Sequence, residues 1–206
     1  MNNPVGIIDY GMGNLGSVSK TLKRIGVHSI QSSKPKELRN CARLILPGVG
    51  HFAKAVENLK KSRLWEYLHE DVIENKKPVL GICLGMQLMA SHSEEGGSEG
   101  LAWLDANVVR FNVPDTLRYK VPHTGWNHIT IDKETNLFSG VDLEQGFYFV
   151  HAYHMICNDK TDILNTTTYG YPFTSAVQRG NVFGVQYHPE KSHSAGKKLI
   201  KNFVEL

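Results

Sequence analysis

The sequence predicts an α/β fold in which a mostly parallel central sheet is flanked by helices and extended by antiparallel strands. Short β-rich runs alternate with helical patterns through the first half of the chain. Such alternation implies right-handed crossovers between parallel strands. In the second half the strand-like runs are separated by turns, which is typical of antiparallel pairing. Because ligands of a parallel sheet bind at the carboxyl ends of its strands, we expect the functional residues there.

The first half begins with a β-turn-α unit. A strand within Val5–Tyr10 leads through a Gly-rich turn into a helix that carries Val18, Leu22 and Ile25 on one stripe, and Gly26 ends that helix. The other elements expected in this half are strands at Ser29–Ser32, Arg43–Pro47 and Pro78–Cys83, and a long amphipathic stretch with Leu64, Leu68 and Val72 on one side.

The second half predicts strands at Val108–Phe111, His128–Ile131 and Phe147–Tyr153, after a loop at Glu94–Gly100. A hairpin and a final helix follow, at Ser175–Gln178, Val182–Tyr187 and Ala195–Leu206. With no repeat and no Pro/Ser-rich linker, we expect one domain over residues 1–206.

Composition excludes several classes of protein. The 206 residues are 41% hydrophobic and 21% charged, which suits one sizeable core. A net charge of +3 is too small and scattered for a nucleic-acid-binding surface. With neither a signal peptide nor a run of about 18 apolar residues, we expect a cytoplasmic protein that does not bind membranes. Cys41, Cys83 and Cys157 are too widely spaced to predict a disulfide framework or a zinc site.

The segment Gly81-Ile-Cys83-Leu-Gly85 has the form of a nucleophile elbow. A nucleophile in a sharp strand-to-helix turn needs small neighbours two residues away on either side. A following helix would favour the thiolate of Cys83, and the backbone N–H of Leu84 would supply half of an oxyanion hole. The competing interpretation is a buried structural cysteine in a Gly-containing strand.

His188-Pro-Glu190 supplies a base for this nucleophile and an acid that orients the base. The motif follows a strand and so reaches the same edge of the sheet as Cys83. Taken alone, the pair could be a surface histidine beside a solvated glutamate. A Gly-rich turn at Pro47–Gly50 could complete the oxyanion hole, or could be only a tight connection.

Two other motifs compete with this hypothesis. Gly11-Met-Gly13-Asn-Leu-Gly16 has the dinucleotide-binding pattern, but the expected acidic residue is absent from Gln31–Lys34, so we interpret it as a turn. His151 and His154 are three residues apart in an extended segment, where side chains point to opposite faces, so we do not expect a metal site.

Three motifs together resemble the triad-type (class I) glutamine amidotransferases: Pro47-Gly-Val-Gly50, Gly81-Ile-Cys-Leu-Gly-Met-Gln87 and Gln186-Tyr-His-Pro-Glu190. Within that family the chain resembles the glutaminase subunits of imidazole glycerol phosphate synthases over nearly its whole length. The segments that carry this resemblance are Ile8–Asn14, Leu46–Phe52, Pro122–Asn127, Tyr148–His151 and His188–Ser192. The resemblance implies a flavodoxin-like form of the predicted fold.

The resemblance also implies a reaction. Cys83 would attack the side-chain amide of L-glutamine, His188 would protonate the departing ammonia and then activate water, and Glu190 would orient His188. The ammonia would pass to a cyclase (synthase) subunit, the heterodimer partner, for histidine biosynthesis. The family's chain uses no metal, nucleotide or prosthetic group. The other implied site residues are Leu84 with Val49 or Gly50 in the oxyanion hole, Gly50, Gln87 and Glu95 for substrate binding, and Asn14, Trp126, Tyr148 and Lys191 at the partner interface.

The chain departs from the common pattern of that subunit at Gly16, Thr124 and Ala152. Ala152 stands where a serine is common, so a hydroxyl near the substrate is absent. These departures leave open a paralogous glutaminase that supplies ammonia to a different synthase-like partner, such as one that aminates a surface sugar. A catalytically silent subunit is a further alternative, which the intact Cys83, His188 and Glu190 disfavour.

Overall fold

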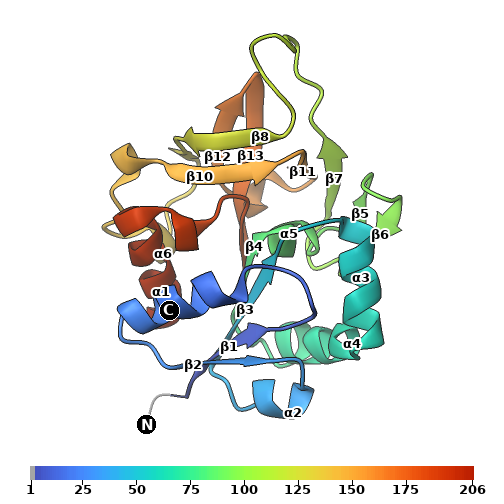
Figure 1. Cartoon of the computed structure of the whole chain (residues 1–206), viewed down its shortest axis with the longest axis vertical. Helices are drawn as coiled ribbons and strands as arrows, with labels where there is room; N and C mark the ends of the chain where they lie inside the picture. Colours follow the sequence, from blue (N-terminus) through green and yellow to red (C-terminus); the bar gives the residue numbers. More distant parts are fainter. Residues whose placement is uncertain (1–2) are drawn as a thin grey trace.

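A computed structural model describes residues 3–206 as a large mixed sheet with helices on both faces of its parallel part (Figure 1). The predicted fold class is confirmed. The parallel strands run in the order β2-β1-β3-β4-β14, and the remaining strands extend the sheet beyond β14. Their bounds are β1 Val5–Ile8, β2 Ser29–Ser32, β3 Arg43–Gly48, β4 Val79–Cys83 and β14 Val182–Val185.

Strands β1, β3, β4 and β14 are buried on both faces, because helices cover both faces, whereas the edge strand β2 is partly exposed. Along β3, Leu44 and Leu46 belong to one hydrophobic core and Ile45 to the other. The first core is covered by α2, α3 and α4, and the second by α1 and α6, which lie side by side in Figure 1. These helices are α1 Leu15–Arg24, α2 Pro35–Leu38, α3 Phe52–Lys61, α4 Leu64–Leu68 and α6 His193–Glu205.

Antiparallel strands form the rest of the molecule, as predicted for the second half. The sheet continues from β14 through β13, β11, β7, β5 and β6, while β12 pairs with β13 and β9. A separate two-stranded sheet joins β8 to β10. The bounds are β5 His92–Ser93, β6 Ser98–Glu99, β7 Ala106–Arg110, β8 His123–Asn127, β9 Thr130–Ile131, β10 Phe147–His151, β11 Tyr153–Cys157, β12 Ile163–Tyr169 and β13 Tyr171–Arg179.

Several expected boundaries were wrong. The run Phe147–Tyr153 is two strands, because the chain bends at Ala152 and joins different sheets on either side. His128 lies between β8 and β9 rather than in a strand. The segment Glu94–Gly100, expected as loop, includes the short strand β6.

The amphipathic stretch before β4 is also interrupted. It ends as α3 at Lys61 and restarts as α4 after Arg63, whose φ of 57° is left-handed and cannot continue a helix. A π-helical turn, η1 (His69–Glu74), follows α4. The remaining short helices are α5 Leu84–Gln87, η2 Asn136–Phe138, η3 Leu143–Gln145, η4 Lys160–Asp162 and η5 Pro189–Lys191.

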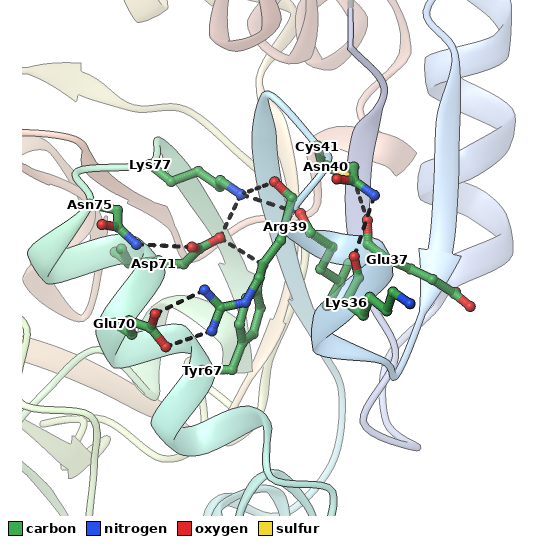
Figure 2. Close-up of polar contacts among 12 residues, drawn as sticks. Lys36, Glu37, Arg39, Asn40, Cys41, Tyr67, Glu70, Asp71, Asn75 and Lys77 are labelled. Atoms are coloured by element: carbon green, nitrogen blue, oxygen red, sulfur yellow. Dashed lines mark hydrogen bonds and ion pairs between the residues drawn. The ribbon is translucent and has the colours of Figure 1, made fainter.

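A group of charged side chains holds η1 against the end of α2 (Figure 2). The buried carboxylate of Asp71 accepts a 2.8 Å hydrogen bond from the Tyr67 hydroxyl and pairs with Lys77. The Lys77 ammonium also donates to the carbonyl oxygen of Arg39 at 3.0 Å, and the guanidinium of Arg39 binds both carboxylate oxygens of Glu70. The polar network therefore joins segments that are about thirty residues apart in the chain.

No helix within residues 3–206 is long and apolar enough to cross a membrane.

Candidate active site

Cys83 occupies a strained turn between β4 and α5. Its φ of 55° and ψ of −111° lie where residues with a Cβ are rarely found. Crowding around the turn explains both flanking glycines: a Cβ on Gly85 would stand 1.8 Å from the carbonyl oxygen of Leu46, and one on Gly81 would stand 2.7 Å from that of Gly85. The backbone thus has the elbow geometry that the sequence pattern indicates.

His188 and Glu190 lie beside this turn because β14 runs parallel to β4, with Val185 opposite Ile82. Both strands therefore end at the same edge of the sheet. His188 Nδ1 is 2.8 Å from Glu190 Oε1, and both side chains are 2% exposed. The hydrogen bond between Nδ1 and the carboxylate fixes the orientation of the imidazole. The second ring nitrogen, Nε2, is then available for proton transfer.

The electrostatics of the pair favour an imidazolium. Burial by itself would lower the pKa of His188, but the neighbouring Cys83 and Glu190 outweigh burial and raise that pKa to about 10. Within residues 3–206, His188 Nε2 has no hydrogen-bond partner, and no hydrogen bond joins it to the Cys83 sulfur.

The sulfur of Cys83 has two other polar neighbours. Gln186 Nε2 lies 3.6 Å from it, at a distance suited to an N–H···S hydrogen bond, and the carbonyl oxygen of Val150 lies 3.9 Å away. Gln186 is fully buried. Sequence reasoning quoted this residue as part of a motif and gave it no role.

The loop expected to complete an oxyanion hole lies next to Cys83. In the pairing of β3 with β4, Gly48 is opposite Cys83, so Val49 and Gly50 directly follow the residue beside the nucleophile. Gly50 has a φ of 122°, and a Cβ there would stand 2.6 Å from the Met12 methyl group. The turn around Gly13 packs under Pro47 and Gly48, where a Cβ on Gly13 would come within 3.1 Å. The Gly-rich motif at Gly11–Gly16 therefore supports the loop.

The two expected substrate-binding side chains differ in their surroundings. Gln87 is buried, and its Nε2 donates at 2.9 Å to both the carbonyl oxygen of Tyr153 and Oε1 of Gln186, so both of its N–H groups are used inside the protein. Glu95 is half-buried, and its Oε2 accepts a 2.8 Å hydrogen bond from the backbone N–H of Phe52 at the start of α3. Glu95 thus lies close behind the loop that contains Gly50.

The histidines considered as metal ligands are closer together than their spacing implied. Because the chain bends between β10 and β11, His151 and His154 both pack against Phe111, with ring centroids 5.2 and 4.7 Å away. His123 Nδ1 lies 3.0 Å from His151 Nε2. Among the described residues, no group of three or more His, Cys, Asp or Glu side chains is arranged to hold a metal ion.

Comparisons with known proteins agree with this geometry. The family model "Glutamine amidotransferase class-I" matches residues 6–206. A relative from Pseudomonas aeruginosa, "Imidazole glycerol phosphate synthase subunit HisH 2", is 48% identical over 97% of this chain and 98% of its own length. A Methanococcus maripaludis relative with the same printed name is 44% identical over 98% of each chain. The chain belongs to the class I glutamine amidotransferases, in the group of HisH subunits.

Solved structures show the same fold at low sequence identity. The structure of PurLQS from Thermotoga maritima matches all of this chain and 99% of the compared chain, with a TM-score of 0.73 at 17% identity.

In this HisH-type amidotransferase, three of the four expected interface residues lie together. The Trp126 ring is 48% exposed and stacks on His193 with centroids 4.8 Å apart, and it meets the Tyr148 ring edge-on at 6.1 Å. The Lys191 ammonium is 5.5 Å from the Tyr148 ring centroid. We name Trp126, Tyr148, Lys191 and His193 the aromatic surface cluster. Sequence reasoning missed His193.

Asn14, the fourth expected interface residue, is the N-cap of α1. Its side-chain oxygen accepts a 3.2 Å hydrogen bond from the backbone N–H of Ser17. Helix α1 contacts η5, which ends at Lys191.

Proposed function

We propose that this chain is the glutaminase subunit of an imidazole glycerol phosphate synthase. It would hydrolyse L-glutamine to glutamate and ammonia through a thioester on Cys83, and pass the ammonia to a cyclase subunit in histidine biosynthesis. The observation that carries the proposal is the placing of a strained, Gly-flanked Cys83 beside the buried His188–Glu190 pair. Relatives that are 40–48% identical over nearly the whole chain support the pathway.

The proposed reaction has two halves, both of which use the same groups. The Cys83 thiolate attacks the amide carbon of glutamine, and the backbone N–H groups of Leu84 and of Val49 or Gly50 stabilise the negative oxygen. The His188 imidazolium then gives its Nε2 proton to the leaving nitrogen, which departs as ammonia. In the second half His188 takes a proton from water, hydroxide attacks the thioester, and glutamate and the thiolate are released.

Substrate selection would rest on the remaining polar groups. We propose that Glu95 and the Gln87 amide oxygen accept hydrogen bonds from the α-ammonium group of glutamine, and that the Gly50 backbone N–H donates to its α-carboxylate. Oε1 of Glu95 makes no hydrogen bond within residues 3–206 and suits an ammonium group, because the other oxygen is already bound to the helix. Glutamine selectivity requires such groups, because a polar site discriminates strongly against a substrate that leaves its groups unpaired.

The partner would dock on the aromatic surface cluster and on Asn14. Tryptophan and tyrosine are enriched at interfaces, and here the exposed Trp126 lies against the half-buried Tyr148. We further infer that residues 1–206 act as one amidotransferase domain, since the family model spans residues 6–206, and that the protein works in the cytoplasm.

Reconstitution tests this function. The chain and a Cys83→Ala variant are each mixed with a cyclase subunit, and synthase turnover is measured with glutamine or with an ammonium salt as the nitrogen source. We expect Cys83→Ala to lose all glutamine-dependent turnover and to keep ammonium-dependent turnover, because the acceptor chemistry lies in the partner. Glutamine-dependent turnover by Cys83→Ala would refute the proposed nucleophile. Activation only by a synthase of another pathway would refute the pathway.

A further inference from the structure

We propose that Gln186 is a positioning residue for the Cys83 thiolate. The Tyr153 carbonyl fixes, through Gln87, which way the Gln186 amide points, and a hydrogen-bond chain through His151 and His123 to Asn127 joins the same carbonyl to strand β8. The inference deepens the proposed function, since it concerns the same nucleophile. Its evidence is the set of buried polar contacts that surrounds the sulfur.

The orientation of Gln186 follows from the carbonyl oxygen of Tyr153. That oxygen can only accept, so Gln87 must place Nε2 against it, at 2.9 Å. The second hydrogen of the same Nε2 then points to Gln186, which must present its Oε1, also at 2.9 Å. The Nε2 of Gln186 is thereby turned toward the Cys83 sulfur, at 3.6 Å. An N–H group in that place stabilises a thiolate more than a thiol.

The same carbonyl fixes the tautomers of two buried histidines. His151 Nδ1 lies 2.8 Å from the Tyr153 oxygen, so it must carry the hydrogen of that bond. In a neutral ring Nε2 is then an acceptor, so its partner among residues 3–206, His123 Nδ1 at 3.0 Å, must carry the hydrogen. His123 Nε2 becomes an acceptor in turn, 3.3 Å from the amide nitrogen of Asn127.

Packing keeps both imidazoles neutral, as this assignment requires. His123 stacks between the rings of Tyr169 and Phe149, with centroids 4.0 and 4.9 Å away. Burial lowers the pKa of His123 to about 4 and that of His151 to about 3. Each N–H group of this hydrogen-bond chain therefore has one acceptor at neutral pH. The two acceptor sites of the Tyr153 oxygen are both filled, by Gln87 and His151.

The hydrogen-bond chain connects the surroundings of Cys83 to strand β8, which carries Trp126 of the aromatic surface cluster. His123 and Asn127 lie at the two ends of β8, and β8 pairs with β10 so that His123 is opposite His151. We infer that a shift of β8 is carried through His123 and His151 to the Tyr153 oxygen, and so displaces the Gln87 and Gln186 side chains that the same oxygen orients beside the sulfur. The other titratable groups around Cys83 are His188, with Glu190 behind it, and the buried Tyr10.

The test measures the thiol directly in the full chain. Cys83 is alkylated with iodoacetamide at a series of pH values, and its modification is followed by peptide mass spectrometry. In Gln186→Glu a carboxylate oxygen faces the sulfur, and we expect alkylation of Cys83 at pH 7 to slow by about tenfold and the pH–rate profile to move to higher pH. Gln178→Glu makes the same chemical change on β13 and is expected to leave the profile unchanged.

Two further variants keep the proposal falsifiable. If Gln186→Glu fails to fold, as judged by its thermal unfolding, Gln186→Met removes the N–H donor without adding charge, and slower alkylation is again expected. His123→Phe tests the distant part of the chain, with His154→Phe, in the same aromatic group, as its control. We expect His123→Phe to slow alkylation of Cys83 by about threefold more than His154→Phe does.

Each part of the proposal can fail separately. An unchanged alkylation profile in the folded Gln186 variants would overturn the positioning role. Equal rates of Cys83 alkylation in His123→Phe and His154→Phe would overturn the proposed connection between Cys83 and β8. Because alkylation requires no glutamine, a protein that shows the expected shifts and yet releases no ammonia from glutamine would refute the proposed function and leave this inference standing.

Discussion

Cys83 has a strained backbone conformation that the packing around it stabilises. A left-handed φ on a residue with a Cβ costs of order 1–3 kcal/mol, and here the parallel strands on either side and the tight packing of α5 hold it in place. This conformation places the sulfur near the buried His188 and the Gln186 amide, at the edge of the sheet where ligands bind.

The crowding at Gly85 gives a residue-scale prediction. In Gly85→Ala the new methyl group would overlap the carbonyl oxygen of Leu46, so β3 and the elbow must separate. We expect the free energy of unfolding to fall by at least about 3 kcal/mol, and glutaminase activity to be lost. Gly16→Ala is the matched control, because nothing lies within 4 Å of its Cβ position in α1. Denaturant titration should show that variant to be stabilised by roughly 0.5–1 kcal/mol. Similar stabilities for the two variants would contradict this packing argument.

Gln186 shows why some site residues are invisible in the sequence. Its role depends on a hydrogen bond to Gln87, 99 positions earlier in the chain, and no local pattern connects the two. Cys83, His188 and Glu190 are candidates from the sequence alone, because each belongs to a short motif with chemistry of its own. His193 lacked such a motif, and only the stacking on Trp126 reveals it.

Among the elements, strands β1, β3 and β4 were predictable because they are buried on both faces and each contains or follows a proline. Strand β12 (Ile163–Tyr169) was missed for the opposite reason. Its buried face includes Asn165 and Thr167, which hydrogen-bond to Ser175 on β13, so the strand lacks an apolar alternation. Strand β8 was missed likewise, since its sequence His-Thr-Gly-Trp-Asn shows no strand period.

The Asp71–Lys77 pair gives a prediction about how η1 is held. Burial alone would raise the pKa of Asp71, but hydrogen bonds from Lys77 and Tyr67 outweigh it and hold that pKa below its usual range. Lys77→Met would leave the carboxylate buried without its cation, and we expect a loss of about 3 kcal/mol at pH 7. A carboxyl group whose pKa is lowered in the folded protein stabilises the fold at pH values above the ordinary carboxyl pKa, which is near 4. The stability that Lys77→Met loses should therefore become smaller as the pH falls below 4.

An exposed ion pair serves as the control for that measurement. Lys54→Met removes one of the two lysines paired with Glu57 on the surface of α3, where the Lys54 and Glu57 side chains are about half exposed. It should change stability by under about 1 kcal/mol. Urea titrations at several pH values measure both variants. A Lys77→Met deficit that is as small as that of Lys54→Met, or that grows toward acid pH, would show that the network contributes little.

In the whole molecule, the central sheet brings Cys83 and His188 together from opposite halves of the chain, and the separate β8–β10 sheet places the aromatic surface cluster next to His188. Strands β4 and β14, about a hundred residues apart, are neighbours. Strand β10 connects the two regions, because the backbone of Tyr148 accepts a hydrogen bond from the N–H of His188 at 2.9 Å and donates one to the Ser192 hydroxyl at 3.0 Å. A partner that contacts Tyr148 would therefore touch a residue bonded to the base.

Trp126 gives the prediction at this scale. Trp126→Ala should weaken binding of a cyclase subunit by at least about 30-fold, because exposed aromatic residues in such clusters carry a large share of binding energy. Ile156→Ala is the control, since Ile156 is 47% exposed, much like Trp126, but lies on β11 outside the cluster. Isothermal titration calorimetry compares the two. Equal affinities for both variants would exclude the cluster as the docking surface.

An electrophilic glutamine analogue tests whether Cys83 is a glutamine-directed nucleophile. The chain is incubated with the analogue, alone and with a cyclase subunit, and the adduct is located by peptide mass spectrometry. We expect a single adduct on Cys83 that glutamine suppresses by competition. Labelling of Cys41 or Cys157 in its place, or no labelling at all with the partner present, would contradict it.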